Sequence, residues 1–342
     1  MKSLPTEQCV GMVLCQDITQ ILPGEFKGVL FKKGHVIREE DIQPLLNVGK
    51  ENLYVWEPEP GSIHENDAAI RLAKAVTGAN IRFNEPAEGK CNLFSEIKGL
   101  FRVNSQALLD MNMIDLVTIA SLPGNYTVDK GQKLAGARVV PLMAPEQCVI
   151  DAEKIAASAG SVFEVLPYQP LKVGVITTGS EVYKGRIKDK FGPVIRDKVK
   201  YFGGKVLDQI FCPDDLQMIQ DAIAKFKADG ADLIILTGGM SVDPDDLTPS
   251  AIRSAAEELV VYGAPVQPGN MICLAYDKNV TLLGVPGCAM YAHTTLLDAV
   301  LPRIFAGVKM TKLDFARMGE GGFCRGCKEC HYPVCFFCRS KF

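Results

Sequence analysis

The chain lacks three features that would each indicate a common class of protein. Lys and Arg number 37 against 40 Asp and Glu, so there is no basic excess with which to hold nucleic acid. No stretch approaches 18 uncharged apolar residues, which argues against a membrane span. The first ten residues contain Pro5 and Glu7 and no apolar signal core. We therefore expect a cytoplasmic protein that binds neither nucleic acid nor a membrane.

Common catalytic and nucleotide-binding patterns are also missing. The sequence has no Walker A motif, and no G-x-G-x-x-G follows a predicted strand, which argues against an ordinary kinase or dehydrogenase. His35 and His64 have no evident serine or cysteine partner, and His293 falls in a predicted helix. Nucleophilic catalysis is therefore poorly supported.

Apolar residues are plentiful, at 47% of the chain, and their pattern predicts an α/β fold. From Leu171 onward, short apolar strands alternate with amphipathic helices, which is typical of a mostly parallel sheet covered on both faces. The predicted strands are 173–177, 206–211, 233–237, 260–262, 272–276 and 281–285; the predicted helices are 194–202, 215–228, 249–256 and 291–305, with Thr248 as N-cap of the third. We expect a three-layer α/β/α domain, preceded by smaller mixed α+β and β-rich segments.

Composition breaks predict four regions. They are a β-rich segment over 1–61, a mixed α/β region over 62–169, the α/β domain over 170–308, and a Cys-rich tail over 309–342. Within the first region, 10–14, 28–31 and 53–56 are predicted strands and 38–46 a helix. The sequence Glu57–Gly61 alternates glutamate with proline and predicts a linker.

Three polar, glycine-rich loops follow predicted strands, at 177–181, 237–246 and 284–289. Ligands of open α/β sheets bind at the carboxyl ends of the strands. Glycine lets the backbone approach a ligand, and successive amides bind anions. Asp243, Asp245 and Asp246 offer oxygen ligands suited to Mg²⁺. The alternative is that the glycines form ordinary turns and the aspartates only cap helices.

The loops, in this order, resemble the molybdopterin-binding domain of the molybdenum cofactor biosynthesis proteins. The resemblance is carried by Thr178-Gly179-Ser180-Glu181, 185–189, Asp214-Asp215, 238–246, Pro268-Gly269 and Pro286-Gly287. Upstream, 10–18, 33–55 and 130–142 resemble a shortened form of the molybdopterin molybdotransferase branch.

The resemblance implies Mg²⁺-dependent insertion of molybdate into adenylylated molybdopterin, with release of AMP. Asp189 and Asp246 would be the catalytic acidic residues, and Asp243 would join Asp246 in binding the metal. The residues expected to bind the pterin are Thr178, Gly179, Ser180, Glu181, Gly238, Gly239, Ser241, Asp243, Pro286 and Gly287.

Two departures keep other functions open. Gln267 and Asn270 replace two lysines of the family pattern, and the Asp-Gly-Tyr-Ala stretch of the family's lid domain is absent. Arg186, Lys188 and Lys190 offer replacement charge. One alternative is a non-catalytic molybdopterin carrier or regulator that docks on a molybdoenzyme or its maturation factor. Another is a nucleotide-processing enzyme acting on a pyridine-nucleotide derivative. The sequence also leaves open whether the protein forms a homodimer.

Twelve cysteines divide into two groups. Seven are scattered from Cys9 to Cys288 and are expected to be small buried hydrophobic residues. The other five are spaced as paired C-x2-C motifs in the tail: Cys324, Cys327, Cys330, Cys335 and Cys338. This spacing predicts a zinc or iron–sulfur site. A redox thiol tail, or one that hands sulfur or metal to a partner, is the alternative.

Overall fold

The computed structural model describes residues 2–22, 26–55 and 60–339, which form two compact units. The first unit comprises most of the chain up to Glu164. The second contains everything from Val165, together with the short segments 97–102 and 123–129. Residues 57–59 of the predicted linker lie outside the described residues. None of the helices in the described ranges is long and apolar enough to cross a bilayer.

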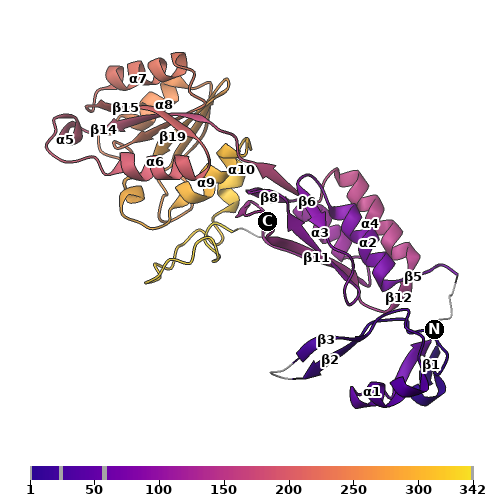
Figure 1. The fold of residues 1–342 in the computed structure, drawn as a ribbon. Helices are drawn as coiled ribbons and strands as arrows, with labels where there is room; N and C mark the ends of the chain where they lie inside the picture. Colours follow the sequence, from indigo (N-terminus) through magenta and orange to yellow (C-terminus); the bar gives the residue numbers. More distant parts are fainter. Residues whose placement is uncertain (1, 23–25, 56–59, 340–342) are drawn as a thin grey trace. The chain divides into compact units, whose positions relative to one another are not determined.

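The first unit begins with two antiparallel strand pairs (Figure 1). β1 (Lys2–Pro5) pairs with β4 (Asn52–Val55), and β2 (Ile18–Leu22) with β3 (Phe26–Phe31). η1 (Thr6–Gln8), η2 (Glu39–Asp41) and α1 (Ile42–Asn47) complete this part. The predicted strand over 10–14 was wrong. Gly11 turns the backbone at a φ of +82°, and Val13 forms an isolated bridge to Val36.

The rest of the first unit is a four-stranded antiparallel sheet with three helices. The strand order is β6 (Ile81–Phe83), β7 (Lys90–Ser95), β11 (Lys133–Val139) and β9 (Val117–Ser121). β5 (Ser62–His64) pairs with β12 (Met143–Pro145). The helices are α2 (Glu65–Val76), α3 (Ser105–Asn112) and α4 (Glu146–Ala159). α2 packs on β7, β11 and α4.

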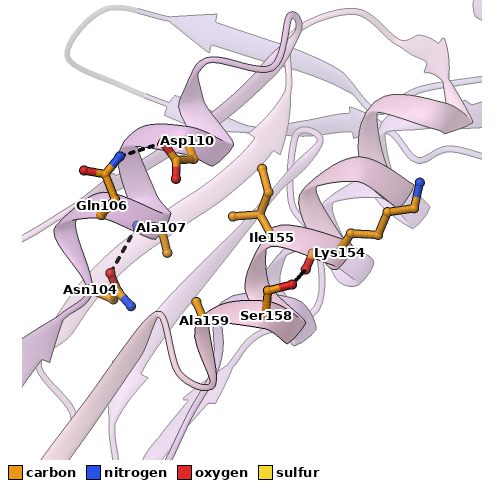
Figure 2. Close-up of a pocket in the computed structure, with 8 residues that line it drawn as sticks. All are labelled: Asn104, Gln106, Ala107, Asp110, Lys154, Ile155, Ser158 and Ala159. Atoms are coloured by element: carbon orange, nitrogen blue, oxygen red, sulfur yellow. Dashed lines mark hydrogen bonds between the residues drawn. The ribbon is translucent and has the colours of Figure 1, made fainter.

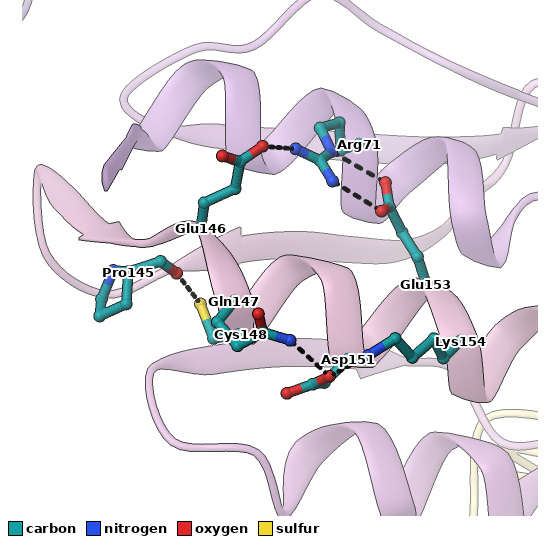
Figure 3. A network of polar contacts seen from close by, with 8 residues as sticks. All are labelled: Arg71, Pro145, Glu146, Gln147, Cys148, Asp151, Glu153 and Lys154. Atoms are coloured by element: carbon teal, nitrogen blue, oxygen red, sulfur yellow. Dashed lines mark hydrogen bonds and ion pairs between the residues drawn. The ribbon is translucent and has the colours of Figure 1, made fainter. Parts of the chain in front are cut away.

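An ion-pair network links α2 to α4 (Figure 3). Arg71 donates to both carboxylate oxygens of Glu153, at 2.9 and 2.7 Å, and to Glu146 at 2.5 Å. The side chains are between 31% and 43% exposed, so each pair adds about 1 kcal/mol or less. The network orients the helices, while the buried Ala69, Leu72 and Val149 supply the apolar contact.

The second unit contains a six-stranded sheet in the order β15-β14-β16-β19-β18-β17. β15 (Lys205–Cys212), β14 (Lys172–Thr178), β16 (Leu233–Thr237) and β19 (Val280–Val285) are parallel. β18 (Cys273–Asp277) and β17 (Glu258–Tyr262) are antiparallel additions. Most of a second, three-stranded sheet also belongs to this unit. Its strand order is β10 (Tyr126–Val128), β8 (Gly99–Val103) and β13 (Phe163–Pro167).

Helices cover both faces of the large sheet, as the sequence pattern predicts (Figure 1). α7 (Leu216–Ala228) and α8 (Thr248–Ala255) close the apolar core on one face. α6 (Phe191–Tyr201), α9 (Leu296–Phe305) and α10 (Lys312–Arg317) close the core on the other. α5 (Ser180–Tyr183) and η3 (Gly287–Met290) are short turns after β14 and β19. The predicted α/β/α architecture is confirmed.

Two helices begin three to five residues away from their predicted first residues, because polar groups fix their first turns. The last long helix was predicted from Tyr291 but begins at Leu296, where Thr295 and Asp298 form a capping box. His293 therefore lies in a loop. α6 begins at Phe191 instead of Val194, because the Asp189 carboxylate accepts hydrogen bonds from the Phe191 and Gly192 amides.

Candidate functional site

The three glycine-rich loops begin side by side at one edge of the large sheet. β14 and β16 are neighbours, with Thr177 opposite Thr237, and Thr237 in turn lies opposite Val285 of β19. All three strands are parallel, so their carboxyl ends meet at this edge. The arrangement therefore gathers backbone amides and polar side chains from three distant parts of the sequence. We call 178–181, 238–246 and 286–288 the loop site.

The first loop is fixed by hydrogen bonds to its neighbours. The Thr178 side chain is buried, and its Oγ1 lies 3.1 Å from Oγ1 of Thr248. Gly179 has a φ of +130°, which favours glycine. The Ser180 amide donates to the Asp214 carboxylate at 3.0 Å. Glu181 is exposed, so of this loop it is the side chain most open to solvent.

Gly238 and Gly239 begin the second loop in left-handed backbone conformations, with φ of +87° and +53°. A Cβ on Gly238 would lie 2.2 Å from the Thr178 carbonyl oxygen, so only glycine lets the two strand ends approach this closely. Thr248 locks the turn from the far side, because its hydroxyl donates to the Gly238 carbonyl at 2.9 Å. Thr248 is thus the first residue of α8 and ties the loop, instead of capping the helix as predicted.

The acidic part of this loop is held by its own backbone. Asp243 accepts a hydrogen bond from the Asp245 amide at 3.1 Å, and Asp246 accepts one from the Asp243 amide at 3.4 Å. The Tyr262 hydroxyl donates to the Ser241 carbonyl at 3.1 Å. Burial raises the pKa of Tyr262, and the negative charge of Asp246 adds to the effect. Tyr262 therefore stays a neutral donor that anchors the loop.

The third loop and Asp189 complete the predicted set. Pro286 is buried and Gly287 exposed at the start of η3. The Asp189 carboxylate is engaged by the α6 amides and by Gln209 Nε2 at 2.7 Å. Gln209 Nε2 also lies 2.9 Å from Thr177 Oγ1, at the end of β14. Asp189 is therefore connected to the loop site through Gln209, which the sequence did not single out.

The basic residues proposed as replacement charge lie between α5 and α6. Arg186, Lys188 and Lys190 are all exposed, as are Gln267 and Asn270 at the positions of the missing lysines. Within the loop site itself no basic side chain occurs. An anion bound there would accept hydrogen bonds from glycine amides, and a bound cation such as Mg²⁺ would have to supply the compensating positive charge.

The structure contains no preformed metal site across the ranges that it describes. No three His, Cys, Asp or Glu side chains there lie close enough together to hold an ion. For the acidic loop this agrees with the preference of Mg²⁺ for one or two carboxylates plus substrate phosphates and water. Asp243 and Asp246 provide such a pair. For the tail, the side chains as placed do not form the predicted zinc or iron–sulfur site.

Four of the five tail cysteines share one cavity, and the fifth lies in the neighbouring apolar core. Cys324, Cys327, Cys330 and Cys335 line a cavity of about 370 Å³, which His293, His331 and Pro268 also line. Cys330 Sγ lies 3.2 Å from Thr294 Oγ1. Cys338 is packed in the apolar core of the second unit, and burial raises its pKa to about 12. Of the seven scattered cysteines, Cys9, Cys15, Cys91, Cys212 and Cys273 are buried, as expected, whereas Cys148 and Cys288 are half-buried.

A separate depression lies in the first unit, between α3 and α4 (Figure 2). Its volume is about 440 Å³, and its lining includes Asn104, Asp110 and Lys154. The polar groups there are partly engaged with each other, since Gln106 donates to Asp110 at 2.7 Å. None of the predicted site residues lines this depression.

Comparison with known proteins agrees with this geometry. Residues 174–306 match a family described as a probable molybdopterin binding domain. This part of the chain therefore resembles the molybdenum cofactor biosynthesis proteins. The match includes the whole loop site, so the resemblance read from the sequence is confirmed. Residues 3–57 match a second family, a domain of unknown function.

Similar curated proteins share only part of their length with this chain. Molybdopterin molybdenumtransferase of Haemophilus influenzae is 27% identical over 224 residues, which are 60% of this chain and 52% of that protein. The enzyme of the same name from Synechococcus elongatus is 24% identical over 176 residues, 48% of this chain and 44% of that one. A CinA-like protein of a Mycobacterium species is 34% identical over 91 residues, 26% and 22% of the two chains. The chain thus spans about half or less of these relatives.

Similar structures include MoaB, a molybdopterin biosynthesis enzyme of Thermus thermophilus. It is 23% identical, with a TM-score of 0.34, and the match covers 39% of this chain and 91% of that one. The tungsten cofactor synthesizing protein MoaB of Pyrococcus furiosus is 18% identical, with a TM-score of 0.35 and coverage of 42% and 99%.

Proposed function

We propose that the loop site binds the phosphate of adenylylated molybdopterin and that the protein inserts molybdate into this pterin, with Mg²⁺, and releases AMP. The observation that carries the proposal is the meeting of the three loops on β14, β16 and β19 inside the matched domain. Each loop alone is an ordinary turn. Together they converge on one edge of the sheet, where the amides of Gly238, Gly239 and Gly287 can donate hydrogen bonds to a single anion.

The chain's own contribution is positioning. Thr248 and Thr178 hold the glycine turn by buried hydrogen bonds, so its amides need not reorganise when an anion arrives. Asp246 and Asp243 would hold Mg²⁺ together with substrate phosphate oxygens. When bound, the metal would supply positive charge for the phosphate, because the loop site has no basic side chain of its own. Asp189 would act from the α6 side, through its link to Gln209 and Thr177.

The test is Mg²⁺-dependent AMP release from adenylylated molybdopterin and molybdate, measured with Asp246→Asn and with Asp245→Asn. Both variants remove one negative charge from the same loop, so they alter its overall charge equally. We expect Asp246→Asn to lower turnover at least 100-fold and Asp245→Asn to change it less than threefold. Equal losses in both would refute a specific role for Asp246.

The alternative is a carrier that binds molybdopterin but does not transfer molybdate to it. It is favoured by Gln267 and Asn270, because each lost charge-assisted hydrogen bond is worth about 1.5–3 kcal/mol. Equilibrium binding of molybdopterin combined with complementation of a transferase-deficient strain separates the two functions. Rescue supports the transferase, whereas tight binding without rescue supports the carrier. Rescue by a Gln267→Lys/Asn270→Lys variant alone would trace the loss of activity to these two charges.

The tail as a metal ligand is a separate proposal. It rests on the C-x2-C spacing and on four of the cysteines sharing one cavity with His293 and His331. A metal would have to draw these side chains closer than they lie here. Elemental analysis and the absorption spectrum of freshly purified protein test this, and a metal content below 0.1 per chain would count against it.

A further inference from the structure

Arg303 is a buried charge in the middle of α9. The residue keeps only 7% of its accessible surface. Its Nε is inaccessible to solvent and, within the described residues, has no hydrogen-bond partner. Buried polar groups in native proteins are normally paired, so an orphaned guanidinium N–H at this depth calls for an acceptor.

A small enclosed cavity adjoins this arginine. Its volume is about 20 Å³, enough for one occupant of about the size of a water molecule. Arg339 lines it from the tail, and Asn125 and Tyr126 line it from the segment that leads into β10. The cavity is separate from the loop site, but it shares the side chains of Tyr332 and Phe337 with the neighbouring cavity lined by Cys324.

The charges around the cavity are mainly positive. The guanidinium of Arg339 lies 4.1 Å from the centre of the Tyr126 ring, so its partner in this contact is an aromatic ring and not a carboxylate. Burial lowers the pKa of both Arg303 and Arg339. The positive charge of Arg102 adds to the effect at Arg303, although Asp314 opposes it.

The neighbouring carboxylates are already engaged. Asp314 accepts hydrogen bonds from the amide and the hydroxyl of Thr311. Asp298 pairs with Lys198 and accepts from the Thr295 amide. Two guanidiniums therefore line one void. Asp314 attracts Arg303 electrostatically, but within the described residues neither guanidinium forms an ion pair with a carboxylate, and burying charge without a close counter-ion is unfavourable.

We propose that this cavity binds one small inorganic anion of the size of chloride, held by Arg303 and Arg339. The occupant would accept the orphaned Nε–H and offset the buried charge. A tetrahedral oxyanion such as sulfate or molybdate is too large for the void. Because Cys338 and Tyr332 of the tail also line the cavity, the anion would fasten the tail onto α9. The Tyr332 hydroxyl already donates to the Asp298 carbonyl at 3.0 Å.

The experiment is thermal unfolding of the full chain at constant ionic strength, with sodium gluconate replaced stepwise by sodium chloride or bromide. A ligand that binds the folded state alone at 100 times its Kd multiplies the folded-to-unfolded ratio about 100-fold. We expect a saturable rise in the unfolding midpoint of several degrees with either halide. Sulfate and molybdate should give no such rise.

Variants test the two arginines. Arg303→Met and Arg339→Gln should each abolish the response to halide, and Arg339→Gln keeps the test open if the buried substitution prevents folding. Arg317→Gln, at an exposed position of α10, is the matched control and should respond as the parent does. The proposal is overturned by equal midpoints in gluconate and chloride, which would indicate a water molecule. It is also overturned by a response to oxyanions alone, or by a halide response that survives in the Arg339 variant.

Discussion

Replacing Gly238 by alanine should damage both the stability of the second unit and its binding of the pterin. The residue has a φ of +87°, a conformation that costs a residue with a side chain about 1–2 kcal/mol. The added Cβ would also lie 2.2 Å from the Thr178 carbonyl oxygen, about 1 Å inside normal contact. Forcing the two strand ends apart costs typically about 1–3 kcal/mol. The expected total is therefore about 2–5 kcal/mol.

Gly230→Ala is the matched control for this prediction. Gly230 also has a positive φ, +76°, but a Cβ there would meet no atom within 4 Å. Its expected cost is the backbone strain alone, about 1–2 kcal/mol. In thermal unfolding, the control should lose about 2–8 °C and Gly238→Ala clearly more, because 1 kcal/mol shifts the midpoint by about 2–4 °C in a unit of this size.

Binding distinguishes the two substitutions further. Equilibrium titration with molybdopterin should give an unchanged Kd for Gly230→Ala and a Kd at least tenfold higher for Gly238→Ala, because displacing the turn moves the Gly238 and Gly239 amides. Equal losses of stability in the two variants would refute the close approach of the strands. Unchanged binding in Gly238→Ala would refute the use of these amides.

Three further predictions concern single groups of the second unit. Thr248→Val should lower the free energy of unfolding by about 1–3 kcal/mol in urea titration, because the Gly238 carbonyl loses its buried donor; Thr311→Val, whose hydroxyl is exposed, should cost less. Asp189→Asn should cost about 1 kcal/mol, because the α6 amides lose a charged acceptor, while the exposed Asp197→Asn should cost less than half of that. In native protein at pH 8, Cys327 should react with iodoacetamide within minutes and Cys338 far more slowly, because a pKa of about 12 leaves only about one Cys338 thiol in ten thousand as thiolate. Peptide mass spectrometry measures the two rates, and equal rates would contradict the burial of Cys338.

The alternation of strands and helices in the second unit was readable from the sequence because burial determines it. β16 is buried at every position, and such a strand appears as a continuous apolar run. The positions of the loops followed from the same pattern, since a loop after a parallel strand must lie at its carboxyl end. The sequence could therefore predict that Gly179, Gly238 and Gly287 share one edge of the sheet.

What the sequence could not reveal are contacts between residues far apart in the chain. Thr248 looks like a helix cap, since it precedes a proline, and its hydrogen bond to Gly238 depends on how the loop folds back. Gln209 sits in the middle of a strand and gives no signal of its link to Asp189. The predicted helix from Tyr291 failed for a different reason: the capping box of Thr295 and Asp298, which favours a later start, is a local signal that the sequence does contain.

If the proposed function holds, Mg²⁺ and the pterin phosphate must bind interdependently. The acidic loop offers two carboxylates but no group of three ligands within the described chain, so Mg²⁺ alone should bind weakly. The loop site has no basic side chain, so the phosphate alone meets amides, hydroxyls and nearby carboxylates but no positive charge. Each ligand supplies what the other lacks, and linkage requires that each raise the affinity of the other by the same factor. Loss of Asp246 should therefore weaken pterin binding in the presence of Mg²⁺ and leave it nearly unchanged in its absence.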